Sequence, residues 1–180
     1  MTCRLADVAD GKNDKNLTFQ RFVLAALLDD VLVAATARLK IMSQGRYQLE
    51  RAAKGRDRRS PWGLDLEVFD QYTGKARPVA TLSGGESFLA SLALALGLAD
   101  VVQSYSGGTY LDTIFVDEGF GSLDPESLDL ALRALMDLQQ GGRLVGLISH
   151  VPELKERIDT RLELKSGPEG KVGTAEFVMS

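Results

Sequence analysis

The sequence is poor in several residue types that build common functional sites. Its 180 residues include one cysteine, Cys3, one histidine, His150, and one tryptophan. A single cysteine excludes a disulfide framework within the chain and a cysteine-based metal site, and it favours a reducing, cytoplasmic environment. The net charge of −4 gives no sign of a nucleic-acid partner, so any contact with DNA must come from a local basic patch.

Long apolar segments and one common nucleotide-binding motif are also missing. The first ten residues contain no apolar region of a signal peptide. The apolar stretch 22–37 contains Asp29 and Asp30 and is too short to span a bilayer, so we expect no membrane partner. No G-x-x-x-x-G-K-[ST] sequence occurs, so the loop that cradles the β- and γ-phosphates of a nucleotide is not part of this sequence.

The first 80 residues predict one long helix and a pair of strands. Residues 1–16 are polar and end in a loop. From 18 to 43 apolar residues recur at steps of three and four, and the predicted buried stripe is Leu24, Leu28, Val31, Ala35, Leu39 and Met42. We favour an amphipathic core helix, with the root of a coiled coil as the alternative. Strands are expected at 47–51 and 64–68.

A basic segment lies between these two strands. It contains Lys54, Arg56, Arg58 and Arg59 close to glycine, serine and proline residues, and it is expected to form a hairpin tip. A solvated loop is the simpler interpretation. The alternative is a contact with the phosphate backbone of DNA, which would depend on salt concentration and not on base sequence.

Helices and strands alternate from residue 81 onward, which indicates an α/β fold with a parallel sheet. Helices are expected at 85–103 and 125–140, and strands at 113–116 and 144–148. The strand 113–116 is expected to be buried, because it is apolar without alternation.

Three further features complete the predicted fold. Asp124 is the predicted N-cap of the second helix, because Pro125 follows it at the first helical position. A short helix is expected after Pro152. An antiparallel hairpin of the strands 161–165 and 174–179 is expected at the edge.

The segment Leu82-Ser83-Gly84-Gly85-Glu86 lies at the start of the first of these helices. Ser83 and Glu86 fit an S-x-x-E capping box, which is the simpler interpretation. Two glycines weaken a helix start by about as much as a cap stabilises it, roughly 1 kcal/mol, so stability alone does not explain them. Glycine lets a ligand approach the backbone, and N–H groups at a helix start bind anions, so we expect a phosphate site here.

Two adjacent carboxylates, Asp117 and Glu118, follow the strand 113–116. Ligands of open α/β sheets bind at the carboxyl ends of the strands. Because neighbouring strand residues point to opposite faces, one carboxylate can face a metal while the other faces a water molecule. Hard oxygen ligands at this position suit Mg²⁺.

Two further segments end at the same edge of the sheet. The segment 119–124 fits a glycine turn followed by an N-cap, and a lone histidine such as His150 is usually structural. However, His150 ends the strand 144–148 and therefore falls beside Asp117 and Glu118. This placement favours a contact with a phosphate or a water molecule.

In this order, the four elements resemble the second half of the head of an ABC-type ATPase. Residues 82–86 are similar to its signature motif, 113–118 to Walker B, 122–124 to the D-loop and His150 to the switch histidine. Within that superfamily the chain resembles the SbcC family, the large subunits of bacterial SbcCD nucleases. The likeness to that family is carried by residues 60–68 and 117–124 and by the glutamate after the signature glycines, and it extends from about Leu17 to the end.

The resemblance implies a site that is shared between two heads. Asp117 would hold Mg²⁺ through water, Glu118 would act as general base on the attacking water, and His150 would contact the γ-phosphate. The signature residues Ser83, Gly84, Gly85 and Glu86 would bind ATP held by the opposite head, and the D-loop would be formed by Ser122, Leu123 and Asp124. ATP would then join two heads.

The resemblance also implies one lobe of a larger protein. Residues 1–16 would lie near the base of a coiled coil and 17–180 would form the C-terminal ATPase lobe. ATP and Mg²⁺ would be fully bound only together with an N-terminal lobe that carries the P-loop. We therefore expect an excised fragment with an artificial start at Met1 and negligible ATPase activity by itself.

The expected partners are the N-terminal lobe, a second copy of the head, an SbcD-like nuclease subunit and double-stranded DNA. The favoured function is DNA repair, in which ATP-driven closure of two heads gates the partner exonuclease. A chromosome-organising SMC head without a nuclease is the alternative, and half of a transporter ATPase is a third. The segment Gly119-Phe120-Gly121 favours the first.

Overall fold

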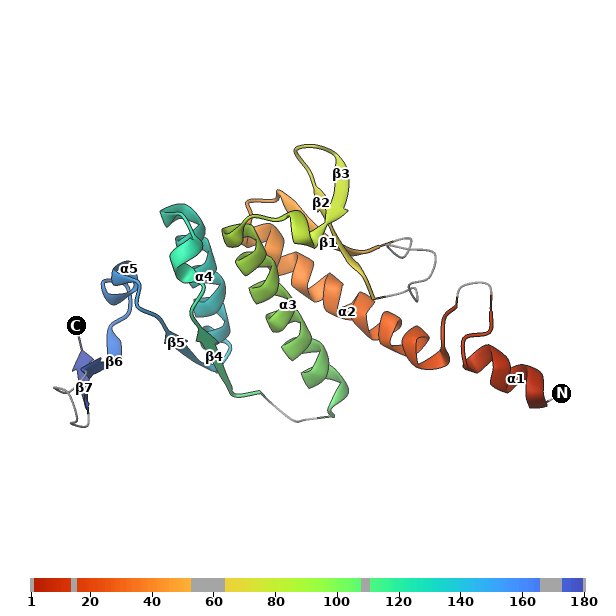
Figure 1. Ribbon diagram of the computed structural model, residues 1–180. Helices are drawn as coiled ribbons and strands as arrows, with labels where there is room; N and C mark the ends of the chain where they lie inside the picture. The colour runs from red at the N-terminus through yellow and green to blue at the C-terminus, as the bar shows by residue number, and fades with distance from the viewer. Residues whose placement is uncertain (1, 14–15, 53–63, 108–110, 166–172, 180) are drawn as a thin grey trace.

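The computed structural model describes residues 2–13, 16–52, 64–107, 111–165 and 173–179. They form an elongated molecule with the N-terminus at one end and the C-terminus at the other (Figure 1). The elements in chain order are α1 (Thr2–Ala9), α2 (Phe19–Met42), β1 (Tyr47–Arg51), β2 (Leu66–Asp70), β3 (Lys75–Pro78), η1 (Val79–Thr81), α3 (Gly84–Tyr105), β4 (Thr113–Asp117), η2 (Phe120–Ser122), α4 (Pro125–Gln140), β5 (Leu144–Ile148), α5 (Pro152–Lys155), β6 (Thr160–Lys165) and β7 (Thr174–Met179). No helix was predicted in the polar residues 1–16, and Thr2–Ala9 form α1 ahead of the predicted loop.

Helix α2 confirms the long helix predicted from the apolar spacing. Thr18 caps it, because its hydroxyl oxygen accepts the N–H of Arg21 at 3.2 Å. The buried side chains of α2 are Ala25, Val31, Leu32, Ala35, Leu39 and Met42. Leu24 is exposed, so its predicted burial is wrong. The physical reason is the length of α3, which ends beside Asp30, where the Tyr105 hydroxyl donates a hydrogen bond to the carboxylate at 2.8 Å.

Helices α2 and α3 pack closely at the centre of the molecule (Figure 1). A Cβ atom at Gly97 would lie 2.7 Å from the backbone nitrogen of Ala35 and 2.9 Å from the carbonyl oxygen of Val31, so only glycine fits at this crossing. Helix α3 is long and apolar enough, by length and composition, to cross a membrane. Here it supplies core residues instead, namely Leu89, Ala90, Leu92, Ala93, Leu96 and Gly97.

A three-stranded antiparallel sheet in the order β1-β2-β3 packs against α2 through β1. Strand β1 has the predicted bounds, and β2 begins two residues later than predicted. The sequence did not indicate β3, since Lys-Ala-Arg-Pro has no apolar alternation. The inward residues of β2 are Val68, which is fully buried, and Asp70, whose exposed fraction is 2%. A charged group at such a position needs a partner within the fold.

The strand–helix–strand unit 113–148 forms as predicted. Strands β4 and β5 are parallel, with Thr113 opposite Leu144 and Asp117 opposite Ile148. Burial of β4 was predicted on both faces, and this is wrong. Ile114 and Val116 pack against the core, whereas Phe115 on the other face is 68% exposed. The described residues cover only one face of this pair of strands.

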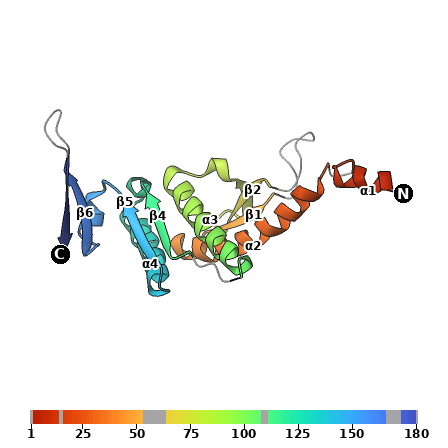
Figure 2. The same ribbon diagram turned by 90° about the horizontal axis from the view of Figure 1, so that it is seen from below.

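A short helix, α5, and the antiparallel hairpin β6–β7 form the C-terminal end of the molecule (Figure 2). Both agree with the prediction, while residues 166–172, between the two strands, lie outside the described residues. The large apolar side chains exposed on this hairpin are Leu162, Leu164, Phe177 and Met179.

Candidate functional site

The capping box predicted at the start of α3 is formed. The N–H of Ser83 donates to Oε2 of Glu86 at 2.9 Å, and the N–H of Glu86 donates to the Ser83 hydroxyl oxygen at 3.4 Å. These bonds occupy two of the amides that a helix start leaves free. In the described part of the chain, the N–H groups of Gly84 and Gly85 have no acceptor. Among the backbone amides at this helix start, those of Gly84 and Gly85 therefore remain open to an anion.

Close packing, and not only ligand access, accounts for the second glycine, Gly85. A Cβ atom at Gly85 would lie 2.8 Å from the carbonyl oxygen of Ser122, which belongs to η2. Glycine is thus required at 85 because η2 approaches the helix start. At Gly84 the nearest atom is Cβ of Ser122 at 3.8 Å, an ordinary contact, so the backbone is more accessible at this position.

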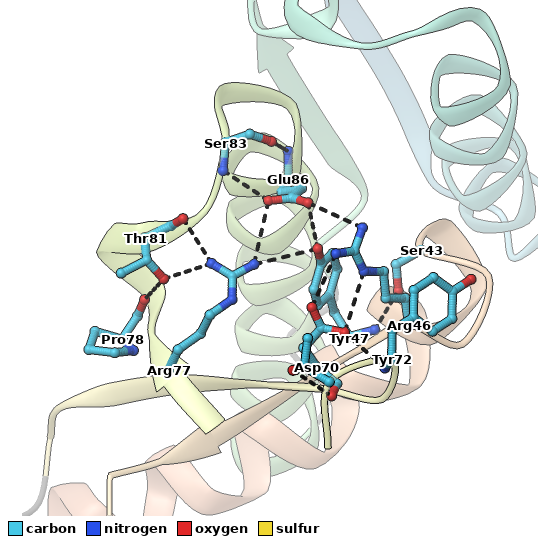
Figure 3. Close-up of polar contacts among 11 residues, drawn as sticks. Ser43, Arg46, Tyr47, Asp70, Tyr72, Arg77, Pro78, Thr81, Ser83 and Glu86 are labelled. Atoms are coloured by element: carbon cyan, nitrogen blue, oxygen red, sulfur yellow. Dashed lines mark hydrogen bonds and ion pairs between the residues drawn. The ribbon is translucent and has the colours of Figure 1, made fainter. Parts of the chain in front are cut away.

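A polar network from the antiparallel sheet surrounds Glu86 (Figure 3). The Tyr47 hydroxyl donates to Oε1 of Glu86 at 2.5 Å. The guanidinium of Arg46 lies 3.6 Å from the same oxygen, and that of Arg77 lies 3.7 Å from Oε2. Burial by itself would raise the pKa of Glu86, but the hydrogen bonds from Tyr47 and Ser83 outweigh it and lower the pKa from its ordinary value of 4.5. The carboxylate is therefore ionised and held on the sheet side of the helix start.

The arginines of this network are fixed by further contacts. Arg46 pairs with the buried Asp70 at 3.1 Å, and its guanidinium lies 4.7 Å from the ring centre of Tyr47 and 5.0 Å from that of Tyr72. Arg77 donates to the carbonyl oxygen and the hydroxyl oxygen of Thr81, at 2.8 and 2.7 Å. Burial, followed by the hydrogen bond to Glu86, raises the pKa of Tyr47 to about 12, so this hydroxyl keeps its proton.

Sequence reasoning did not find this network. One signal was present, because Asp70 follows Leu66 and Val68 at the inward positions of a strand. A carboxylate in such a place indicates a buried ion pair, although the sequence does not say with which arginine.

The two carboxylates at the end of β4 lie where predicted, but not as successive strand residues. Asp117 is the last residue of β4, while Glu118 has a positive φ of 60° and Gly119 one of 95°. The argument from alternating strand faces therefore does not apply to Glu118. Its N–H donates to the carbonyl oxygen of Ile148 at 2.8 Å, which fixes this unusual backbone against β5.

The structure brings His150 and Glu118 together, as their shared edge predicted. Nδ1 of His150 lies 2.9 Å from Oε2 and 3.2 Å from Oε1 of Glu118, and both side chains are exposed. An imidazole beside a carboxylate at an open edge can hold a water molecule or a phosphate oxygen between them. Among the described residues, no group of three histidine, cysteine, aspartate or glutamate side chains could hold a metal. Asp117 alone still fits Mg²⁺ bound to a nucleotide, because such an ion takes one or two carboxylates, phosphate oxygens and water.

The turn η2 joins the two halves of the site. The rings of Phe88 on α3 and Phe120 pack edge to face with their centres 5.0 Å apart. A Cβ atom at Gly119 would lie 2.2 Å from the ring of Phe88, so this glycine is required for the packing as well as for its backbone angle. Asp124 then caps α4, as predicted, by accepting the N–H groups of Glu126 and Ser127 at 3.1 and 3.0 Å. The basic residues 54–59 lie outside the described residues.

The described residues share the fold of SMC ATPase heads. A solved structure from work on ATP-driven dimerization and DNA stimulated activation of SMC ATPases matches with a TM-score of 0.59 and 16% identity, over 88% of this chain and 89% of that chain. An Smc head domain from Pyrococcus yayanosii, with a coiled coil and joint, matches with a TM-score of 0.58 and 16% identity, over 84% of this chain and 27% of that chain. The predicted α/β lobe of an ABC-type head is confirmed.

The sequence then identifies the branch within this class. Residues 53–137 match the family model described as SbcC/RAD50-like, Walker B motif. The SbcC protein of the SbcCD nuclease from Vibrio cholerae is 62% identical over 160 residues, and that from Staphylococcus aureus is 52% identical over 163 residues; they cover 89% and 91% of this chain. The chain belongs to the SbcC family, as the motifs predicted. It spans 16% of the length of each of these relatives.

Proposed function

We propose that this chain is the C-terminal ATPase lobe of an SbcC-like protein that repairs DNA double-strand breaks, with ATP-driven association of two heads gating a partner exonuclease. One observation carries the proposal. A single lobe contains two separate half-sites, the open amides of Gly84 and Gly85 and the Glu118–His150 pair, joined by η2. Neither half cradles a triphosphate, because the sequence contains no P-loop. A second head supplies the complementary half.

The two half-sites act on different nucleotides. Glu118 accepts a proton from the attacking water as general base, and His150 steadies the γ-phosphate beside it. Asp117 is the residue that would hold Mg²⁺, which would supply positive charge for the phosphates. The amides of Gly84 and Gly85, together with Ser83, bind the γ-phosphate of the nucleotide held by the opposite head. The turn formed by Ser122, Leu123 and Asp124 lies beside this contact.

The open face of β4 and β5 supports an N-terminal lobe as the first partner. Phe115, Leu144 and Ile148 are large apolar side chains that the described residues leave exposed. A parallel sheet is normally covered on both faces. We propose that the N-terminal lobe, which brings the P-loop, extends this sheet and buries that face. The chain by itself then has negligible ATPase activity.

The remaining partners follow from the relatives. Their names place them in the SbcCD nuclease and so support an SbcD-like nuclease as partner. They also support repair of double-stranded DNA as the process and the cytoplasm as its location. The identities of 62% and 52% with these relatives, against 16% with the SMC heads, favour this function over a chromosome-organising SMC head.

Reconstitution of the head tests the proposal. This chain is mixed with its N-terminal lobe, and the mass of the complex is followed by light scattering with and without Mg-ATP. The Glu118→Gln variant is expected to accumulate as an ATP-bound dimer, because it binds nucleotide without activating the water. Glu153→Gln, which changes an exposed carboxylate on α5, is the matched control and should behave as the wild type. A Glu118→Gln head that stays monomeric with ATP contradicts the role of Glu118, and rapid ATP turnover by the chain alone contradicts the shared site.

A further inference from the structure

The helix start of α3 poses an electrostatic problem for any phosphate that binds there. Oε2 of Glu86 lies 2.9 Å from the N–H nitrogen of Ser83, and the next two amides are those of Gly84 and Gly85. The carboxylate of Glu86 is ionised, since its pKa is lowered. A full negative charge so close to the open amides repels an incoming phosphate unless a positive charge compensates it.

Two guanidinium groups lie near that carboxylate, and they are not equivalent. Arg46 stands 3.6 Å from Glu86 and helps to lower the pKa of that carboxyl, but it is also paired with the buried Asp70 at 3.1 Å, so its single positive charge is shared between two carboxylates. Arg77 stands 3.7 Å from Oε2 of Glu86. Among the described residues, no other carboxylate forms an ion pair with Arg77. Arg77 therefore supplies the second positive charge that the two carboxylates, Asp70 and Glu86, require.

The position of Arg77 is fixed from both sides (Figure 3). Its Nη1 donates to the carbonyl oxygen of Thr81 at 2.8 Å and to the Thr81 hydroxyl oxygen at 2.7 Å. That hydroxyl in turn donates to the carbonyl oxygen of Pro78 at 2.7 Å. On the other side, Nη2 of Arg77 lies 3.5 Å from the Tyr47 hydroxyl, which donates to Oε1 of Glu86. Strand β3, the turn η1 and the start of α3 thus converge on one guanidinium.

We propose that Arg77 is a positioning residue that neutralises the carboxylate of Glu86 and holds it towards β1 and β3, so that the first amides of α3 stay open to the phosphate of the opposite head. Tyr47 assists by fixing the second oxygen of the carboxylate. This inference rests on the proposed function, because it concerns the same helix start. It adds one requirement to those of the signature residues. The negative charge of the Glu86 carboxylate must be neutralised before the helix start can bind an anion.

A rescue experiment tests the inference in the complete head, formed by this chain and its N-terminal lobe. The affinity of head association is measured with a non-hydrolysable ATP analogue. Arg77→Gln is expected to weaken association about tenfold, because it leaves one uncompensated charge beside the phosphate. The double variant Arg77→Gln with Glu86→Gln is expected to recover most of that loss. Glutamine still fits the capping box, so the cap itself survives the second change.

A purely structural role of Arg77 gives a different pattern. If Arg77 only ties Thr81 to β3, removing the charge of Glu86 restores nothing, and the double variant stays as weak as Arg77→Gln. Arg77→Lys extends the test, because it keeps the positive charge and loses the two hydrogen bonds of the guanidinium to Thr81. The head with this variant is expected to associate with an affinity within about threefold of the wild type. Added salt should reduce the defect of Arg77→Gln, since it screens the uncompensated charge.

The matched control is Arg51→Gln, which removes another half-exposed arginine. Arg51 forms two hydrogen bonds of 2.8 Å with Asp29 on α2, away from the start of α3. Its association is expected to equal that of the wild type. A wild-type head that does not associate with the analogue overturns the proposed function, and the inference with it. A wild-type head that associates, together with an unaffected Arg77→Gln head or a double variant without recovery, overturns the inference alone.

Discussion

At the scale of single residues, Gly119 carries two constraints at once. Its φ of 95° lies in the left-handed region, and the place of a Cβ atom is filled by the ring of Phe88. Gly142 has a similar φ of 89°, but nothing lies within 4 Å of its Cβ position. A substitution at Gly142 therefore tests the energy of the backbone angle alone, whereas one at Gly119 tests the backbone angle together with the packing.

Alanine substitutions at these two glycines should differ in stability. Gly142→Ala is expected to cost about 1 kcal/mol for the backbone angle alone. Gly119→Ala is expected to lower the free energy of unfolding by roughly 2 kcal/mol more, because the new methyl group displaces the ring of Phe88 into a closely packed core. Denaturant unfolding of the head measures both. Equal losses for the two variants would contradict the packing of Phe88 on Gly119.

Asp70 makes a pH-dependent contribution to stability. The hydrogen bond from Arg46 is the main cause that lowers the pKa of Asp70 below its ordinary value of 3.8. A lowered pKa stabilises the folded state fully above about pH 4, and this contribution is lost as the pH falls through the folded-state pKa. Asp70→Asn should therefore be less stable than the wild type at pH 7, and the difference should shrink below about pH 4. Melting temperatures measured from neutral to acidic pH give the comparison, and a constant difference contradicts the ion pair with Arg46.

At the scale of elements, α4 begins where its cap and its proline place it. The carboxylate of Asp124 accepts two backbone N–H groups and the Ser127 hydroxyl, at distances of 2.6 to 3.1 Å. The hydrogen bonds from Ser127 lower the pKa of Asp124, which shows that the cap is the ionised form. Because η2 lies immediately before this cap, the start of α4 also positions the turn that packs on α3.

Substitutions of Asp124 separate its capping role from a role in nucleotide binding. Asp124→Ala is expected to lower stability by about 1 kcal/mol, whereas Asp124→Asn should cost only a few tenths, since asparagine caps a helix almost equally well. Thermal unfolding tests both. If Asp124→Asn unfolds as easily as Asp124→Ala, the cap depends on charge and not on hydrogen bonds. ATP-induced association of the stable Asp124→Asn head then reports on the D-loop alone.

At the scale of the whole molecule, the chain is acidic, with a net charge of −4, yet its proposed partner is DNA. The basic residues Arg56, Arg58 and Arg59 are the part of the sequence that fits a phosphate backbone. Replacing all three with glutamine is expected to weaken DNA binding by the complete head at low salt. The slope of log affinity against log salt should fall by up to about 3, because each lost phosphate contact removes about 0.9. An unchanged slope would mean that these three arginines do not contact DNA and that the segment is a solvated loop.

Much of the fold and part of the site could be predicted from local sequence. The helix α4 and the strands β1 and β5 have the predicted bounds, because caps, glycines and apolar spacing act over a few residues. The capping box at Ser83 and Glu86 follows from the same local rules, and the place of His150 at the same sheet edge as Glu118 follows from the parallel order of two strands. The third strand, β3, was missed, because pairing with β2 outweighs its weak strand pattern.

The sequence by itself therefore determined most of the elements, their order and the identity of the motifs, since these depend on neighbouring residues. Only the tertiary structure decided which groups meet across the chain. Gly85 is glycine because η2 approaches it, Glu86 has Arg77 as an ion-pair partner because β3 brings that residue within 3.7 Å, and Glu118 leaves the strand conformation because β5 holds its backbone. These contacts join residues far apart in the sequence, and their geometry arises only when helices and sheets pack at van der Waals distance.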